Sequence, residues 1–483
     1  MHRHLIASLT VIVGLVGALL TSAVSSADDP APAAKKPSHK VVRVTQPDAQ
    51  RPAEVSVAVN PADPDQVIAV SHQSGGQGKA PASFAYVSDN GGASWKATRQ
   101  QDMPQRHQGD DAITFGMEGT AHRAFLAFNG IRMSRPLHAS TGIYVSSFRD
   151  GAWGPPAPVV DHVNSVEPFE DKPWIVVDTL PDSPHRGNMY VSWTRFDVYG
   201  SKNPAHKSHI YFSRSKDGGR TFSPAHRISD SPGDCQDSSQ TLMGAVPVVG
   251  PDGAVYVVWS GPEGIVFDKS TDGGWTFGPD KVLTKTPGGW DIPVEGLIRH
   301  NGCPVLGVDL SSGPNRGSLY VNWIDKRNGD ADVFLMASRD KGETWSEPIR
   351  VNDDDKGNGK DQLFTWMAVD PADGSINIVF YDRRGQKDSM TGVTMARSVD
   401  GGRTFVNHKV DQEPFPCNRN VFFGDYIGIA AAQGRVVAVY SHFLNRTQLA
   451  LSAAVFHFKP GTQEAVEETD NKEPNGKPAK APR

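Results

Sequence analysis

The sequence has few cysteines and no marked excess of charge of one sign. Three cysteines occur in 483 residues, and none shows the Cys-x-x-Cys spacing of structural zinc sites. The formal net charge is −5, and the lysines and arginines are dispersed along the chain. Because nucleic-acid binding requires a concentrated positive surface, we expect no nucleic-acid partner.

Long apolar runs are lacking after the first residues of the chain. Segment 5–20 is apolar, follows a His-Arg-His start and precedes small residues at 25–27. This order is typical of a signal peptide, so we expect residues 1–27 to direct secretion to an extracellular or periplasmic location, leaving no membrane span after cleavage. An uncleaved N-terminal membrane anchor is the alternative.

Glycine and proline are abundant, with 48 and 36 residues, and the hydrophobic residues (38%) are spread evenly from about residue 54 to 457. This composition is typical of a domain with many short strands and turns. Segments 28–39 and 461–483 are rich in proline and lysine, so we expect a disordered linker and a disordered tail. A single domain is predicted at 40–460.

One octapeptide pattern, Ser-x-Asp/Asn-x-Gly-x-Ser/Thr-Trp/Phe, recurs through this domain. The copies are 88–95 (SDNGGASW), 215–222 (SKDGGRTF), 270–277 (STDGGWTF), 338–345 (SRDKGETW) and 398–405 (SVDGGRTF), with a degenerate sixth at 146–153 (SSFRDGAW). The Asp or Asn side chain can accept hydrogen bonds from a turn, the glycine can take positive φ, and the aromatic ring can pack beneath. Alternating strands precede the copies, which predicts a turn between the third and fourth strands of a four-stranded blade. The pattern resembles the Asp-box (BNR) repeat of sialidases and related propellers over nearly the whole mature chain.

Counting the remaining strands predicts the number of blades. The expected first strands are 54–60, 111–117, 172–178, 243–250, 303–309, 364–370 and 426–431, and the expected second strands are 67–71, 124–129, 189–194, 254–260, 319–325, 376–382 and 436–442. The last unit has a third strand at 448–456 but no fourth, so segment 40–45 (KVVRVT) is predicted to complete it and close the ring. We therefore predict an all-β, seven-bladed β-propeller, with a six-bladed sialidase-type ring as the alternative.

Strand alternation places the Asp boxes on one face and the loops between second and third strands on the other. The opposite face also carries the long, charged connections between blades, which is where we expect a ligand site. Guanidinium groups can clamp a carboxylate, so we predict a pocket for an anionic or polyhydroxylated glycan. The predicted substrate-binding residues are Arg195, Arg299, Arg327, Arg383, Asp382 and Asp425. The alternative is that these charges only pair with one another around the rim.

The resemblance to sialidases implies catalytic roles for three residues. That family uses three arginines on the sugar carboxylate, a tyrosine nucleophile assisted by a glutamate, and an aspartate as acid/base. By position, Tyr426 would be the nucleophile at the start of the last inner strand, Glu295 its partner, and Asp171 or Asp111 the acid. The implied activity is that of an exo-α-sialidase-like glycoside hydrolase. The first blade, however, lacks the family's Arg-Ile-Pro segment, and a seventh blade departs from the family's architecture.

Two other functions are open. A polysaccharide lyase would need a base such as His300 or Tyr426 near an arginine that neutralises a uronate. A non-catalytic propeller that binds carbohydrate or protein is the other, because the fold does not imply catalysis. Three guanidinium groups converging on Tyr426 would favour the sialidase, whereas one or none would favour a lyase, another hydrolase or a binding protein.

The cysteines and several aspartates fall in the blade connections of the proposed functional face. Disulfides are favoured in exported proteins, so we predict a bridge between Cys235 and Cys303, with Cys417 free. Four aspartates before inner strands could ring the channel mouth, where they would need Ca²⁺ or pairing with Lys172 and Lys360; they are Asp111, Asp171, Asp361 and Asp425. No other cofactor is predicted, and we expect a monomer.

Overall fold

The structure, a computed structural model, describes residues 39–46, 49, 51–73, 82–98, 100, 103–131 and 134–466. The predicted signal peptide, residues 28–38 of the predicted linker and residues 467–483 of the predicted tail lie outside the described residues. The chain divides into the unit Met1–Lys36 and the compact unit Pro37–Arg483, and the fold below is that of the second unit. No helix in the described ranges has the length and apolar character that crossing a membrane requires.

The described strands form seven antiparallel sheets. Blade 1 contains β2 (Pro52–Asn60), β3 (Asp63–Gln73), β4 (Ala82–Ser88) and β5 (Lys96–Thr98). Blade 2 contains β6 (His107–Phe115), the 3-10 turn η1 (Met117–Gly119), β7 (Ala121–Asn129), β8 (Ser140–Arg149), β9 (Ala152–Trp153) and β10 (Ala157–Val163). Blade 3 contains β11 (Phe169–Val177), β12 (Met189–Phe196), β13 (Ser208–Ser215) and β14 (His226–Arg227).

The remaining blades repeat this order. Blade 4 contains β15 (Met243–Val249), β16 (Val255–Gly261), β17 (Gly264–Ser270) and β18 (Lys281–Thr284). Blade 5 contains β19 (Val305–Val308), β20 (Leu319–Asp325), β21 (Asp332–Ser338) and β22 (Ile349–Arg350). Blade 6 contains β23 (Gln362–Val369), β24 (Ile376–Asp382), β25 (Met390–Ser398), β26 (Val406–Lys409) and β27 (Phe415–Pro416). Blade 7 contains β28 (Gly428–Ala432), β29 (Arg435–Phe443), β30 (Leu449–His457) and β1 (His39–Arg43).

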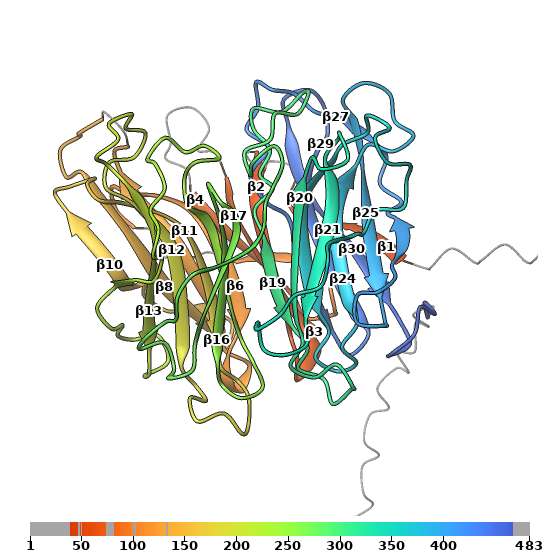
Figure 1. The fold of residues 1–483 in the computed structure, drawn as a ribbon, viewed down its shortest axis with the longest axis horizontal. Helices are drawn as coiled ribbons and strands as arrows, with labels where there is room; N and C mark the ends of the chain where they lie inside the picture. The colour runs from red at the N-terminus through yellow and green to blue at the C-terminus, as the bar shows by residue number, and fades with distance from the viewer. Residues whose placement is uncertain are drawn as a thin grey trace, which may run out of the picture. The chain divides into compact units, whose positions relative to one another are not determined.

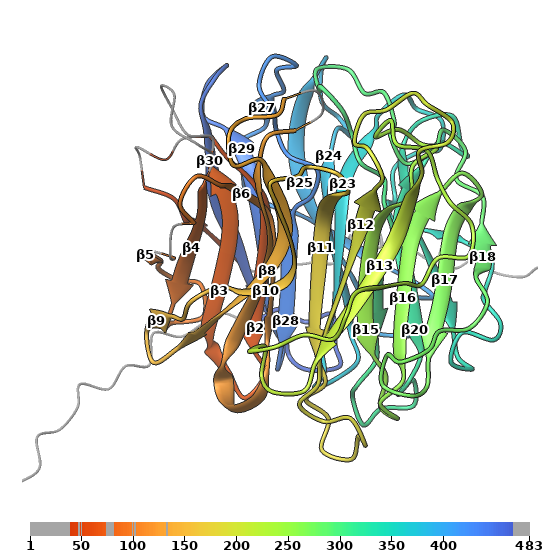
Figure 2. The same cartoon turned by 90° about the vertical axis from the view of Figure 1, so that its left-hand side faces the viewer.

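The first strands of the seven blades contact one another in a closed ring. Contacts run in the order β2, β6, β11, β15, β19, β23 and β28, and β28 contacts β2 again. Figure 2 shows the N-terminal strands β2 and β3 beside the C-terminal β28 to β30. The predicted seven-bladed β-propeller is therefore confirmed, and the six-bladed alternative is wrong.

Blade 7 is completed by the two ends of the domain. Strand β1 pairs antiparallel with β30, with Val41 opposite Ala454 and Arg43 opposite Ser452 (Figure 1). This is the closure that segment 40–45 predicts, and it covers the edge that β30 would otherwise expose. Residues 461–466 of the predicted tail are described too, and the backbone oxygen of Thr462 accepts a hydrogen bond from Arg397 of blade 6 (3.0 Å).

The Asp boxes occupy the predicted turns after the third strands. In the box of blade 3, the Ser215 hydroxyl contacts Asp217 (2.8 Å) and accepts the Gly219 N–H (2.9 Å), while Asp217 accepts the Thr221 N–H (2.9 Å). Gly219 has φ of 83°, which a residue with a side chain rarely adopts. The hydrogen bonds from Thr221 lower the pKa of Asp217 to about 2. The boxes are thus turn-stabilising elements, as the sequence predicts.

An irregularity at the start of the inner strands prepares the functional site. The pairing of first and second strands slips between Ala53 and Ser56 in blade 1, and similar β-bulges occur in blades 2, 3, 4 and 6. The bulged residues have positive φ and are Glu54 (53°), Asp110 (50°), Lys172 (48°), Gly244 (74°) and Phe364 (39°). In blade 1 the bulge pairs with the Gln73 end of β3, whereas the Asp box adjoins Val67 at the other end. The bulges therefore lie on the face opposite the Asp boxes.

Candidate functional site

The bulges of three blades converge on one lysine. The Lys172 ammonium forms ion pairs with Asp425, with Asp110 (3.4 Å) and with Glu54 (3.6 Å). We call these four residues the Lys172 cluster; they come from blades 1, 2 and 3 and from the segment before β28. The lysine side chain is 7% exposed and that of Asp425 is fully buried. Burial alone would lower the pKa of Lys172, but Asp425, Asp110 and Glu54 raise it well above its usual value, so the lysine carries its charge.

A second cation, Arg299, closes the cluster from the connection between blades 4 and 5. Its Nε donates to Asp425 Oδ1 (2.6 Å) and its Nη1 donates to Asp237 Oδ2 (2.7 Å). Asp237 Oδ2 also accepts the hydroxyl of Tyr199 (2.7 Å). Although burial favours a neutral Asp425, Arg299 and Lys172 hold its pKa well below the usual value. Asp425 is therefore an ionised, buried anchor that holds both cations in place.

A pocket of about 270 Å³ opens over this network, and we call it the channel-mouth pocket. It has a charged side and an apolar side. The charged side includes Glu54, His72, Asp110, Asp171, Lys172 and Arg299. The apolar side includes Leu126, Phe128, Ile131, Phe169 and Phe422. Concave sites with apolar walls and a few convergent polar groups are the usual form of small-molecule sites.

Two carboxyl groups of this pocket are shifted toward the protonated form. Burial and the neighbouring Asp110 raise the pKa of Asp171 well above its usual value, against the opposing charge of Lys172. Burial and Asp110 also raise the pKa of Glu54. Glu54 contacts His72 Nδ1 (3.1 Å), and this contact raises the pKa of the imidazole despite its burial. Asp171, whose pKa is raised, thus lies in the same network as Asp425, whose pKa is lowered, and opposed shifts of this kind are how proteins prepare an acid and a base together.

Four charged residues of this network have backbones in the left-handed region. Glu54, Asp110 and Lys172 are the bulge residues given above, and Asp237 has φ of 58°. A residue with a side chain in this region costs about 1–3 kcal/mol, and such strain gathers at functional sites. The concentration of strained, charged residues distinguishes this pocket from a set of ordinary rim ion pairs.

Tyr426, the predicted nucleophile, lies beneath the cluster. The inner strand of blade 7 begins at Gly428, so Tyr426 precedes it rather than opening it. Its hydroxyl donates to the backbone oxygen of Asp111 (3.3 Å), and its ring packs against Trp174 with centroids 5.4 Å apart. Burial and the carboxylates of Glu54 and Asp110 raise the pKa of Tyr426 well above its usual value. A tyrosine nucleophile would need the opposite shift.

Of the four predicted arginine clamps, Arg299 alone is in this network. Arg195 Nε donates to Glu170 (2.8 Å), Arg327 Nη2 pairs with Asp325 (2.6 Å), and Arg383 Nη2 donates to the backbone oxygen of Glu295 (2.8 Å). None of these three arginines lines the channel-mouth pocket; the Arg195 and Arg327 pairs lie within their own blades, and Arg383 reaches the connection between blades 4 and 5.

The two other predicted site carboxylates lie apart from the pocket lining. Asp382 accepts the Thr394 hydroxyl (2.7 Å) within blade 6, and Glu295 is exposed. The structure therefore brings together Asp171, Arg299, Asp425 and Tyr426 from the predicted set. Glu54, His72, Asp110, Lys172 and Tyr199 were not predicted as site residues.

His300, the predicted base of a lyase, is fully buried. Its Nε2 accepts the backbone N–H of Phe364 (3.0 Å). Burial, together with the positive charges of Arg383 and Lys326, lowers its pKa to about 3. A neutral imidazole whose accepting nitrogen already holds the blade 6 bulge is a structural residue.

The predicted disulfide is wrong, because Cys235, Cys303 and Cys417 are free thiols in the structure. Cys235 is fully buried in a segment that bridges to Ser201, whereas Cys303 packs against Gly244. The two thiols thus occupy separate packing environments. Burial raises the pKa of Cys303 to about 12, so its thiolate is not formed near neutral pH.

Three of the four aspartates expected to ring the channel mouth have separate partners. Asp111 pairs with the buried Arg123, Asp425 pairs with Lys172 and Arg299, and Asp361 accepts the Ala331 N–H (2.9 Å). Within the described ranges, no group of three or more His, Cys, Asp or Glu side chains is arranged to hold a metal ion. These residues therefore do not fit Ca²⁺. The other expected arrangement, an ion pair with Lys172, is present for Asp425.

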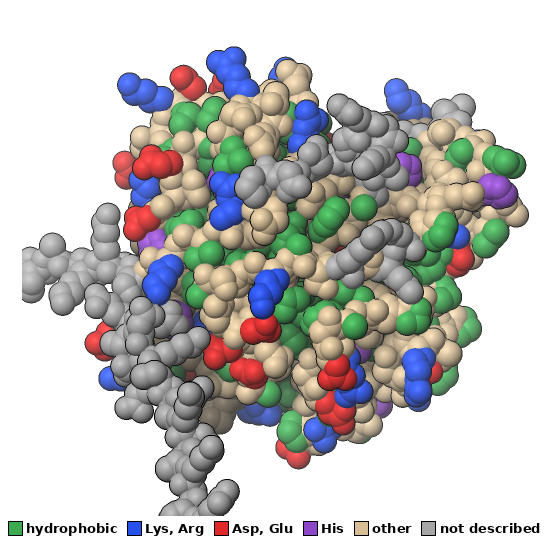
Figure 3. Space-filling model, turned by 180° about the vertical axis from the view of Figure 1, so that it is seen from behind, with side chains coloured by type: hydrophobic (Ala, Val, Ile, Leu, Met, Phe, Trp, Pro, Cys, Tyr) green, Lys and Arg blue, Asp and Glu red, His purple; other side chains and the backbone are tan. Residues whose placement is uncertain are grey.

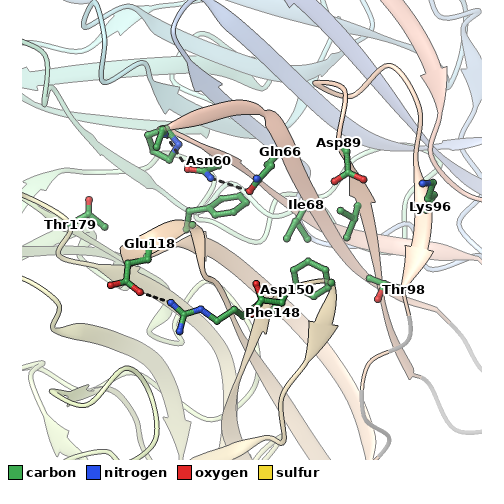
Figure 4. A pocket seen from close by; sticks show the side chains of 18 of the residues that line it. Asn60, Gln66, Ile68, Asp89, Lys96, Thr98, Glu118, Phe148, Asp150 and Thr179 are labelled. Atoms are coloured by element: carbon green, nitrogen blue, oxygen red, sulfur yellow. Dashed lines mark hydrogen bonds and ion pairs between the residues drawn. The ribbon is translucent and has the colours of Figure 1, made fainter. Parts of the chain in front are cut away.

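A larger hollow lies on the Asp-box face between blades 1 and 2, with a volume of about 930 Å³ (Figure 4). Ile68, Phe115 and Phe148 contribute apolar lining, and Glu118 and Arg149 pair across its rim with highly exposed side chains. The hollow lies beside blade 2, whose turn carries only the degenerate motif. Its charged groups are exposed rather than buried, so we do not regard it as the reaction site.

Figure 3 shows one face of the domain, where basic and acidic side chains are interspersed. This face has no continuous basic stripe of the kind that tracks a nucleic-acid backbone.

Comparison with known proteins places the repeat in a wider group. A family model described as a BNR repeat-like domain matches residues 187–460, more than half of the chain. No curated protein matches the sequence. Three similar solved structures are a protein of unknown function from Dyadobacter fermentans (11% identity, 87% of this chain and 98% of that chain, TM-score 0.48), the α-L-arabinofuranosidase Arb93A from Fusarium graminearum (11%, 88% and 98%, 0.48) and the Hadza microbial sialidase Hz136 (15%, 81% and 74%, 0.45).

Proposed function

We propose that this chain, which belongs to the family of BNR repeat-like domains, is a secreted glycoside hydrolase that acts at the channel-mouth pocket. The observation that carries the proposal is the placement of Asp171, whose pKa is raised, in one buried network with Asp425, whose pKa is held low by Arg299 and Lys172. Carboxyl groups with opposed protonation states are what cleavage of a glycosidic bond requires. The apolar side of the pocket supports a ligand that presents C–H faces as well as hydroxyl groups.

In the proposed reaction, Asp171 donates its proton to the oxygen of the leaving sugar as the glycosidic C–O bond breaks. Asp237 is the second carboxylate: its Oδ1 is buried and has no hydrogen-bond partner among the described residues. It accepts a proton from the water whose oxygen bonds to the anomeric carbon. Tyr199 and Arg299 hold Asp237 through Oδ2, which leaves Oδ1 to act. Asp237 then releases its proton to solvent and Asp171 regains one from solvent, so the net reaction is hydrolysis.

Tyr426 has a positioning role in this proposal. Its ring lies 5.8 Å from the Lys172 ammonium and its hydroxyl is held by the Asp111 backbone. The sialidase assignment, with Tyr426 as nucleophile and Glu295 as its partner, predicts a covalent intermediate on the tyrosine. One guanidinium group, that of Arg299, lies in the network rather than three, which by the criterion set from the sequence favours a lyase, another hydrolase or a binding protein over a sialidase.

The test is hydrolysis of sialyl, uronate, neutral and amino-sugar glycosides by the purified protein and its variants. Asp171→Asn and Asp237→Asn are expected to lower kcat by about 10²–10⁴-fold, the usual contribution of a positioned acid or base. Glu118→Gln, on the Asp-box face, is the matched carboxylate control and should leave kcat unchanged. Loss of activity in Tyr426→Phe, together with a covalent intermediate trapped on Tyr426 of the wild type, would restore the sialidase mechanism. No turnover of any glycan would leave a carbohydrate-binding propeller.

A further inference from the structure

We propose that the channel-mouth pocket selects a sugar without negative charge and prefers one that carries an ammonium group. This inference deepens the proposed function, since it names the substrate class of the same pocket. It departs from the anionic glycan that the sequence predicts, and it follows from where the charges of the pocket are already used.

Both permanent cations of the pocket are committed to internal carboxylates. Lys172 pairs with Asp425, Asp110 and Glu54, and Arg299 pairs with Asp425 and Asp237. The Lys172 side chain is 7% exposed, so a ligand could reach it only by displacing one of these partners. Leaving a displaced carboxylate unpaired in such a site is costly. The Arg299 side chain is 28% exposed, but its Nε, Nη1 and Nη2 already donate to Asp425 and Asp237. A uronate or a sialic acid would therefore meet only cations that are already paired.

Acceptors, by contrast, are in excess. The network contains five carboxyl groups, those of Glu54, Asp110, Asp171, Asp237 and Asp425, and two permanent cations. The pKa values of Glu54 and Asp171 are raised, but a protonated carboxyl group still accepts hydrogen bonds through its carbonyl oxygen. The Asp237 side chain is 6% exposed, and its Oδ1 lacks a hydrogen-bond partner in the described part of the chain. Asp237 thus adds negative charge behind the pocket lining, and Asp110, which lines the pocket with its side chain 14% exposed, presents an acceptor that an ammonium group of a ligand would contact.

The opposite side of the pocket fits the apolar face of a sugar ring. Phe128, Phe169 and Phe422 lie in its lining, and Phe128 and Phe169 are in edge-to-face contact with centroids 5.7 Å apart. A ring placed between these aromatics and the carboxylates would present its C–H groups to one side and its donors to the other. The pocket thus combines acceptors with apolar surface, which is the complement of an amino sugar.

The experiment is calorimetric binding to Asp171→Asn, in which the amide replaces a carboxyl that is proposed to be neutral and turnover is prevented. The probes are the methyl β-glycosides of glucosamine and N-acetylglucosamine, which differ only at C2, and of glucuronic acid, which carries a hydroxyl at C2 and a carboxylate at C6. Methyl α-N-acetylneuraminate is the second acidic probe. We expect the glucosaminide to bind at least about tenfold more tightly than the glucuronide, equivalent to about 1.4 kcal/mol. Added salt should reduce the difference.

Asp237→Asn tests the source of the preference. Its amide can keep a contact with Tyr199 but removes the charge, so the ratio of glucosaminide to glucuronide affinity should fall severalfold. Should Asp237→Asn fail to fold, the same affinity ratio is measured in Asp110→Asn, which changes a carboxylate of the pocket lining. Glu118→Gln should leave the ratio unchanged.

Tighter binding of either acidic glycoside, or an unchanged ratio in both Asp variants, would overturn the inference, as would the absence of binding by any probe. Failure of the proposed function is separate. If the amino sugar binds preferentially but the wild type cleaves no glycoside, the charge preference stands and the hydrolase does not. If the wild type cleaves a uronide best, the hydrolase stands and the preference does not.

Discussion

Replacement of Lys172 by Met removes the cation on which three blades converge. Methionine has a similar length, and like lysine it has an unbranched side chain, so it adds no strain to the left-handed backbone conformation of residue 172 (φ 48°). The substitution leaves Glu54 and Asp110 without their cation, with side chains 5% and 14% exposed, and leaves Asp425 paired with Arg299 alone. Breaking a buried ion pair by removing one partner costs about 3–5 kcal/mol, so we expect a loss of that size in the free energy of unfolding near neutral pH.

The pH dependence of this loss is the more specific expectation. The pKa of Glu54 is already raised from 4.5 in the native protein, and loss of Lys172 raises it further. A carboxyl whose folded pKa is raised makes the native state bind more protons than the unfolded state, so stability falls as pH rises from 4.5 through the folded pKa. The difference between wild type and Lys172→Met should therefore be small below pH 4.5 and largest near neutrality.

Denaturant unfolding followed by tryptophan fluorescence, repeated across this pH range, measures the effect. The double variant Lys172→Met/Glu54→Gln should recover about 1–3 kcal/mol of the loss, because it removes one of the carboxylates left unpaired. Lys96→Met, at an exposed lysine beside the hollow of Figure 4, is the matched control and should change stability by less than about 0.5 kcal/mol. A loss in Lys172→Met that is independent of pH, or no loss at all, would refute the role of the lysine as an electrostatic anchor.

Four further predictions concern the fold. Ser270→Ala removes a hydroxyl that contacts Asp272 and accepts the Gly274 N–H, so it should lower the free energy of unfolding by about 1–3 kcal/mol in a denaturation assay. Ser146→Ala in the degenerate motif should lower it by less, because the buried Ser146 hydroxyl has no partner among the described residues. Deletion of residues 1–43 removes β1 and should lower the Tm, while deletion of 1–38 should not; equal melting curves would contradict the closure by β1. Thiol titration in denaturant without reductant should find three thiols per chain, and a count of one would restore the predicted bridge. The pKa of Asp217 is lowered from 3.8 to about 2, so its contribution to stability is present above pH 3.8 and is lost as pH falls toward 2. In Asp217→Asn, the free energy of unfolding should therefore fall less steeply over this acidic range than in the wild type.

The number of blades and the closure of blade 7 could be predicted because both follow from patterns within short segments of the sequence. The Asp boxes determine the turn between the third and fourth strands through contacts made within eight residues. The alternating segment 40–45 precedes the first blade in sequence, and the last blade lacks a fourth strand, so the two can be matched. The face opposite the boxes could also be predicted, since strand direction alone decides it. Such features require no knowledge of which side chains meet across the ring.

The composition of the site could be predicted only in part. Asp171, Arg299 and Asp425 were found because charged residues precede inner strands, but Glu54, Asp110 and Lys172 enter the pocket through β-bulges. A bulge shifts a strand by one residue and redirects a side chain, and alternation cannot reveal it. Arg195, Arg327 and Arg383 lie outside the channel-mouth pocket because they contact other groups, namely Glu170, Asp325 and the Glu295 backbone. Alignment of the blades with one another would have shown a charged residue just after Ala53, Gly109 and Asp171, at the start of three inner strands. That recurrence was a signal for the site.

The protonation state of Asp171 tests the central claim most directly. Infrared difference spectroscopy of wild type against Asp171→Asn, recorded as a function of pH, isolates the carbonyl band of this one carboxyl group. The account predicts a protonated-carboxyl band that persists well above pH 3.8, where an ordinary aspartate is ionised, and that is absent from the variant. A band that disappears near pH 3.8 would contradict the account, because Asp171 would then have no proton to donate.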